Sequence, residues 1–283
     1  MNHRNRVTSS AGHAPSGTPT VVPTRLGRLH VRAIGDGAAT VLWPSMFVDS
    51  HTWDPIVPLL PTGRRYLLVD PPGLGLSEAL PHVSDIAGAA DAAGDLLDGL
   101  GVDGPVDWVG NAFGGHVGYK LAARPGRLRS LVAISAPTQP IPAPLRRQIR
   151  LLLPILRAAG PVGPVRSAIL AAMLTDESAA TEPIRRTVLE SLARPTRRSM
   201  AMALRSFILN RVDVTAELAD LTAPSLFVAS DDRGDWSPED AEAAAALAPD
   251  ARAVTVAAAR TLVPLEQPEA VALQVRRFWD QLA

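Results

Sequence analysis

Apolar stretches with the pattern of buried strands alternate with helical stretches along the first half of the sequence, and this alternation limits the fold strongly. The strand patterns are "ATVLWP", "RRYLLVD", "VDWVG" and "LRSLVAIS", ending at residue 135. Helical spacing follows the second of them at 84–101 and the third at 113–124. Strands that alternate with helices predict an α/β fold with a mostly parallel, doubly wound sheet.

The alternation is interrupted once and then resumes. Residues 137–215 have helical patterning without a convincing strand, whereas "APSLFVAS" at 223–230 restores the strand pattern. A helix at 238–247, the strand "ARAVTVA" and a final helix follow. We therefore expect a core formed by 21–136 and 216–283, with a helical cap at 137–215 inserted after the sixth strand. Residues 1–20 are polar and are predicted to be a flexible tail.

Composition excludes several classes of function. The chain has 283 residues, 47% of them hydrophobic, no net charge and no cysteine. Nucleic-acid binding needs a concentrated basic surface, and none is visible in the sequence. No apolar run is long enough to span a bilayer and no secretory signal is present, so we expect a cytoplasmic protein without a membrane partner. No metal-ligand cluster or cofactor fingerprint is found. The expected partner is a small-molecule ligand or substrate, and a homodimer is left open.

The turn "GNAFGG" at 110–115 lies between a predicted strand and a predicted helix. Many hydrolases place a nucleophilic serine at such a turn, in the pattern G-x-S-x-G. Here the flanking glycines, Gly110 and Gly114, are present, but Ala112 stands between them. An alanine side chain cannot act as a nucleophile. The turn therefore predicts the backbone geometry of a nucleophile elbow without its reactive oxygen.

Four segments in order resemble the α/β-hydrolase fold: "DPPGLGLSE", the stretch from "GNAFGG" to residue 135, "LTAPSLFVASDDRGDWSPEDA" and "VPLEQPEAV". The resemblance covers about residues 20–282. It implies a Ser-Asp-His triad, with Ala112 at the nucleophile position and Thr261 at the histidine position. A substitution made to trap a substrate would explain Ala112 alone. However, the last histidine of the chain is His116, so the triad order of serine, acid and histidine cannot be completed.

The resemblance implies an acid after the strand 223–230. The usual spacing puts Arg233 at that position, and a shift of one residue puts Asp232 there, with Asp235 also near. The alternative interpretation is that these acidic residues only solvate a loop. Asp49, in the loop "FVDSHTW", is a further candidate for a catalytic acid or base. The sequence therefore predicts a degenerate triad, with three aspartates as catalytic candidates.

An oxyanion hole needs only backbone N–H groups, which survive substitutions of side chains. By resemblance the donors are the amides of Met46 and Phe113. Side chains from the same loops and from the predicted cap are expected to line a pocket. These are Pro44, Ser45, Phe47, His51, Asn111, Met173, Met200, Phe207 and Trp236.

Three functions agree with these features. The favoured one is a small-molecule enzyme that cyclises, isomerises or eliminates on a carbonyl compound without an acyl-enzyme. The second is a pseudo-hydrolase that binds a ligand or partner without turnover. The third is an ester, lactone or C–C hydrolase that is inactivated or uses a water. Activity of the ordinary serine-hydrolase type is not expected, because nucleophile and histidine are both missing.

Overall fold

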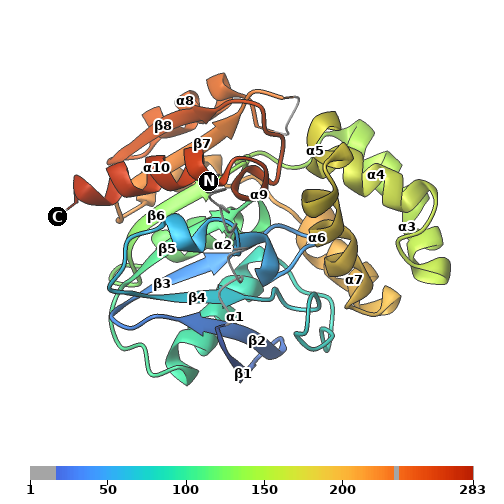
Figure 1. Ribbon diagram of the computed structural model, residues 1–283, viewed down its shortest axis with the longest axis horizontal. Helices are drawn as coiled ribbons and strands as arrows, with labels where there is room; N and C mark the ends of the chain where they lie inside the picture. The colour runs from blue at the N-terminus through green and yellow to red at the C-terminus, as the bar shows by residue number, and fades with distance from the viewer. Residues whose placement is uncertain (1–16, 233–235, 283) are drawn as a thin grey trace, which may run out of the picture.

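The computed structural model describes residues 17–232 and 236–282. Most of the predicted tail, residues 1–16, lies outside this part, whereas residues 18–20 belong to the first strand. Eight strands form one sheet in the order β1-β2-β4-β3-β5-β6-β7-β8 (Figure 1). They are β1 Thr18–Thr24, β2 Gly27–Ile34, β3 Ala38–Trp43, β4 Arg64–Val69, β5 Val106–Asn111, β6 Leu128–Ile134, β7 Ser225–Ser230 and β8 Ala251–Val256.

The sheet is parallel from β4 to β8 and antiparallel at its β1 edge. β1 pairs with β2, and β2 with β4, in antiparallel register, and all the other neighbours are parallel. The α/β-hydrolase fold expected from the sequence is therefore confirmed. β1 and β2 form a hairpin, with its turn at Gly27, which has a φ of 98° that favours glycine.

Side chains of the central strands alternate between two cores because successive residues point to opposite faces. In β6, Leu131 and Ala133 join one core, and Val132 and Ile134 join the other. The first core is covered by α1 Ile86–Gly99, α2 Phe113–Ala122 and α8 Pro238–Leu247. The second is covered by α9 Val263–Glu266, α10 Pro268–Asp280 and two short 3-10 helices, Ser50–Trp53 and Val57–Leu59. Such two-sided burial explains the continuous apolar runs of these strands.

Helices between β6 and β7 form the cap, which lies beside the sheet at the right of Figure 1. They are α3 Ala143–Ala159, α4 Pro164–Met173, α5 Asp176–Ala180, α6 Glu182–Ala193 and α7 Arg197–Ala203, followed by a π-helical stretch Leu204–Leu209 and a 3-10 helix Thr215–Asp220. Prolines in the first turn of α3, α4 and α6 suit the start of a helix because a proline lacks the N–H that would be unpaired there. The cap reaches the rest of the chain near the carboxyl ends of the parallel strands, where ligands bind in open α/β sheets.

Candidate active site

The turn between β5 and α2 has the backbone of a nucleophile elbow. Ala112 has φ 45° and ψ −102°, a conformation that alanine rarely adopts. Its N–H donates to the carbonyl oxygen of Ile134 (2.7 Å), and the N–H of His116 donates to its carbonyl oxygen (3.0 Å). A Cβ on Gly114 would lie 2.1 Å from the carbonyl oxygen of Trp43, so this position needs glycine. Tight packing around the turn holds this strained backbone in place.

Two backbone amides next to the elbow are available to an anion. Phe113 is the first residue of α2, and Met46 lies in the loop after β3. Neither N–H donates to another backbone group in the described part of the chain. Phe47, next to Met46, also has a positive φ of 67°, so both donor loops contain a strained residue. The dipole of α2 adds positive potential at Phe113. This arrangement fits an oxyanion hole.

A cavity of about 500 Å³ lies between these loops and the cap. Ser45, Met46, Ala112 and Phe113 form part of its wall, and α3 contributes the facing aliphatic side chains. Those side chains are Leu145, Ile149, Leu152, Leu153 and Leu156. Their spacing of three or four residues places them on one side of the helix. The cavity can therefore hold an apolar chain whose polar end reaches the two amides.

His116 is the buried titratable group on the cavity wall beside the elbow. It follows Ala112 by four residues, so both lie on the same side of the start of α2. Its Nε2–H donates to the carbonyl oxygen of Pro137 (2.9 Å), because a carbonyl can only accept. Burial, together with the nearby charge of Arg211, lowers its pKa to about 3. The ring is thus neutral near pH 7, with the lone pair on Nδ1.

The loop after β8 closes another side of the cavity, with Arg260 and Thr261 on its wall. The carbonyl oxygen of Thr261 accepts from Nδ2 of Asn111 (2.8 Å), so the position expected for the histidine does lie beside the elbow. Glu266 holds this loop by accepting from the N–H of Arg260 (2.9 Å). Its other oxygen accepts from the N–H of Thr175 in the cap (2.8 Å).

The candidate acids do not reach the cavity wall in the described part of the chain. Nη2 of Arg260 donates to the carboxylate of Asp232 (2.9 Å), so this carboxylate is already held in an ion pair. Arg233 and Asp235 lie outside the described residues. Asp176, which the sequence did not suggest, is on the cavity wall, but its side chain is 91% exposed. Among the described residues, the carboxylates therefore provide no buried base next to the amides of Met46 and Phe113.

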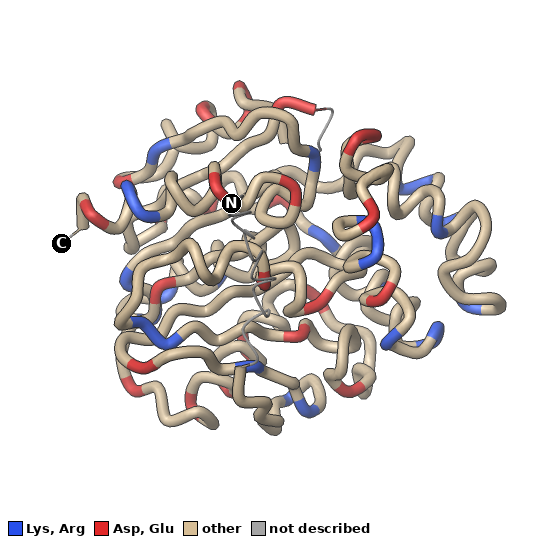
Figure 2. Tube along the Cα trace, in the orientation of Figure 1, with Lys and Arg blue, Asp and Glu red and all other residues tan. Residues whose placement is uncertain are grey.

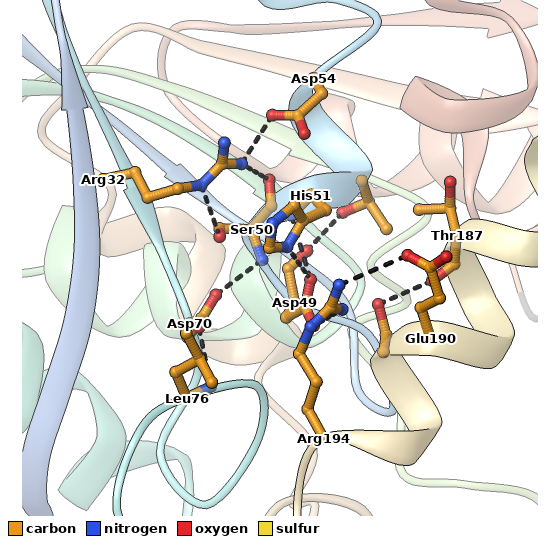
Figure 3. A network of polar contacts seen from close by, with 12 residues as sticks. Arg32, Asp49, Ser50, His51, Asp54, Asp70, Leu76, Thr187, Glu190 and Arg194 are labelled. Atoms are coloured by element: carbon orange, nitrogen blue, oxygen red, sulfur yellow. Dashed lines mark hydrogen bonds and ion pairs between the residues drawn. The ribbon is translucent and has the colours of Figure 1, made fainter. Parts of the chain in front are cut away.

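Asp49 lies in a network that joins the loop after β3, which carries Met46, to the cap (Figure 3). It is fully buried and accepts from Nη1 of Arg194 (2.6 Å) and from Nδ1 of His51 (2.8 Å). Burial alone would raise the pKa of Asp49, but the hydrogen bond from His51 and the charge of Arg194 outweigh burial and lower it. Asp49 is therefore a carboxylate that links the loop carrying Met46 to Arg194, directly after α6.

The structure separates the expected pocket residues into two groups. Ser45, Phe47, Met173 and Phe207 are on the cavity wall. The others lie off it: Pro44, His51, Asn111, Met200 and Trp236. Met200 and Trp236 are buried in the first core, where their apolar side chains are removed from water. Asn111 uses its amide to join the elbow to Ile134 and Thr261, and His51 binds Asp49.

The sequence did not assign the inner face of α3, Arg260 or His116 to the site. The spacing of His116 from Ala112 was an available signal, because residues four apart share a helix face. Among the described residues no group of histidine, aspartate and glutamate side chains could hold a metal ion. No helix within 17–232 or 236–282 is long and apolar enough to cross a membrane.

Curated relatives and solved structures agree with this architecture. A pimeloyl-[acyl-carrier protein] methyl ester esterase of Xanthomonas axonopodis is 26% identical over 264 residues, covering 88% of this chain and 98% of that protein. An esterase from Thermogutta terrifontis has a TM-score of 0.81 at 24% identity, over 94% of this chain and 99% of its own. An enol-lactonase from Burkholderia xenovorans has a TM-score of 0.83 at 21% identity, over 92% and 100%.

These comparisons contradict the favoured functional prediction. Cyclisation, isomerisation or elimination on a carbonyl compound was expected, yet the relatives are named as an esterase and a lactonase, enzymes that hydrolyse esters. A pseudo-hydrolase is not supported by these names either. The names support instead the third of the three functions, an ester-hydrolysing enzyme, which the missing serine and histidine had placed last. Residues 40–275 match the alpha/beta hydrolase family. Since this match covers most of the chain, the protein belongs to the alpha/beta hydrolase family.

Proposed function

We propose that this protein hydrolyses carboxylic esters that have an apolar acyl chain. The observation that carries the proposal is the strained turn at Ala112, which presents the N–H of Phe113 beside an apolar cavity. In this arrangement the ester carbonyl oxygen accepts from the amides of Met46 and Phe113, and the acyl chain lies along α3. Two such donors stabilise the negative charge that develops on the carbonyl oxygen during attack.

Water is the nucleophile in this proposal, because Ala112 has no reactive atom. The water oxygen bonds to the carbonyl carbon while one of its protons passes to Nδ1 of His116. The tetrahedral intermediate then collapses, the bond to the leaving oxygen breaks, and that oxygen takes the proton back from the imidazolium. The products are a carboxylic acid and an alcohol. Negative charge on the oxyanion offsets the cost of the buried imidazolium during the reaction.

The choice of His116 follows from the positions of the other ionisable groups. Asp49 and Asp232 are used in ion pairs and lie off the cavity wall, and the Asp176 side chain extends into solvent. His116 is buried beside the elbow and is held by Pro137 in the tautomer that leaves Nδ1 as the acceptor. A base with such a low pKa is a weak one, so the expected turnover is slow.

The relatives support the class of reaction. Their names describe a methyl ester of an acyl group on a carrier protein and an enol-lactone, which is a cyclic ester. Both carry the same kind of reactive carbonyl. The aliphatic side of this cavity along α3 further supports an apolar acyl chain.

A series of p-nitrophenyl esters from acetyl to decanoyl tests the proposal. Each added methylene that becomes buried contributes about 0.8 kcal/mol, so kcat/KM is expected to rise about fourfold per methylene until the cavity is filled. Leu152→Gln, on the cavity wall, is expected to remove most of this dependence. Leu151→Gln is the matched control, because Leu151 is 71% exposed and does not line the cavity. A rate independent of chain length would contradict the proposed binding mode.

A further inference from the structure

Helix α3 has an unusual distribution of charge and exposure. Its 17 residues include Arg146, Arg147, Arg150 and Arg157 but no aspartate or glutamate. Only Leu156 among them is fully buried. In Figure 1 the helix lies at the outer end of the cap, farthest from the sheet. Its arginines appear there in blue, without red along the helix, in Figure 2.

The outer side of α3 is apolar as well as the side that lines the cavity. Leu151 is 71% exposed, more than any other large hydrophobic side chain of the described residues, and Ile155 is 38% exposed. The two are four residues apart and therefore share one face. Val162, shortly after the helix ends, is 43% exposed. The outer face of the helix therefore presents an exposed aliphatic stripe, of the kind that marks interaction surfaces.

The arginines beside this stripe lack acidic partners. Arg150 and Arg157 face Arg198 and Arg205 across a groove of about 610 Å³ between α3 and the end of the cap. Within the part of the chain that the structure describes, none of these four forms an ion pair. The groove floor is apolar and includes Leu153 and Met202. The surface therefore combines uncompensated positive charge with exposed aliphatic side chains.

We propose that this outer face of the cap binds an anionic lipid surface, with α3 lying in the plane of the interface. Leu151, Ile155 and Val162 enter the boundary between headgroups and acyl chains, and the arginines pair with lipid phosphates. A basic amphipathic helix is typical of such binding. The sequence led to the expectation of no membrane partner because no segment spans a bilayer, but a helix on the surface needs no spanning length.

A lipid surface fits better than a soluble acidic protein. An acidic partner seated in the groove would pair with the arginines but would leave Leu151 and Ile155 in water, because neither lines the groove. A lipid interface accepts both kinds of side chain together. The binding does not depend on ester hydrolysis, so either proposal can fail without the other.

Vesicle flotation with the full chain tests the proposal. We expect binding to vesicles of phosphatidylcholine with one third phosphatidylglycerol, little binding to phosphatidylcholine alone, and release by salt. Each arginine near an anionic surface contributes about 1 kcal/mol, so the double variant Arg150→Gln/Arg157→Gln should bind about 30-fold more weakly. Leu151→Glu is also expected to bind more weakly.

Leu247→Glu is the matched control, because Leu247 is also exposed (51%) but lies on α8. It should bind like the wild type. Circular dichroism and the rate with a soluble ester show whether Leu151→Glu remains folded, and both should be unchanged. Absence of binding to the anionic vesicles would overturn the proposal, as would equal binding by the double arginine variant. Binding to soluble polyglutamate but not to vesicles would overturn it in favour of an acidic protein partner.

Discussion

Asp49→Ala is expected to lower the free energy of unfolding by about 3 kcal/mol. Asp49 is fully buried and accepts hydrogen bonds from Arg194 (2.6 Å) and His51 (2.8 Å). Its removal leaves the Arg194 side chain, only 22% exposed, without its closest anion. Loss of one partner of a largely buried ion pair is costly because the remaining charge stays desolvated. Urea unfolding at neutral pH measures the difference.

Glu190→Gln is the matched control for this change. Glu190 also pairs with Arg194, but at 3.5 Å and with a side chain that is 57% exposed. Exposed pairs contribute little, so the control should lose less than about 1 kcal/mol. Equal losses in both variants would show that Asp49 does not hold the cap to the loop after β3.

The loss of stability in Asp49→Ala should also become smaller at low pH. The pKa of Asp49 is lower in the folded protein than in the unfolded chain. The ionised carboxylate therefore contributes its full stabilisation above the unfolded pKa. It is lost as pH falls through the folded pKa. The difference between wild type and Asp49→Ala should therefore shrink below about pH 4.

The second large effect is expected on the rate of ester hydrolysis, when His116 is replaced. His116→Gln should reduce kcat/KM for ester hydrolysis about 100-fold, the lower range for loss of a general base. Glutamine can still donate to the carbonyl oxygen of Pro137, so the packing of α2 is largely kept. Tyr119→Phe is the control: it removes a buried hydrogen bond to Ala136 from the same helix, but Tyr119 is not on the cavity wall. That variant should lose stability and keep its rate.

The pH profile separates this base from an ordinary catalytic histidine. Because the pKa of His116 is lowered to about 3, the neutral ring is almost fully populated above about pH 5. The wild-type rate should therefore not fall between about pH 8 and pH 5 through loss of this base. A histidine with its usual pKa would lose most of its base form across that range. An inflection near pH 6.5 that is absent in His116→Gln would contradict the low pKa.

Much of the fold could be predicted because it depends on local patterns. The continuous apolar run of β6 and the glycines around Ala112 are both signals within a few residues. The site was less accessible because it depends on contacts between distant segments. Arg194 reaches Asp49 from 145 residues away, and no local pattern indicates that pairing.

The same reason explains the unassigned cavity residues. Met200 and Trp236 were expected at the pocket because they belong to the cap and its rim, yet tertiary packing places both in the core. His116 lies on the wall, although a histidine on a buried helix also suits simple packing. The favoured function was wrong for a chemical reason: the absence of a serine nucleophile excludes an acyl-enzyme at Ala112, but it does not exclude hydrolysis by water, which the sequence had left as its third candidate.

The central claim is that water, and no residue of the chain, attacks the ester. Intact-protein mass spectrometry during turnover of a p-nitrophenyl ester tests it most directly, with product release followed in the same samples. We expect steady release of p-nitrophenol above the rate in buffer, no initial burst, and no acylated protein at any time. Accumulation of an acyl adduct, for example on Ser45 at the cavity wall, would contradict the mechanism. Release no faster than in buffer would contradict ester hydrolysis itself.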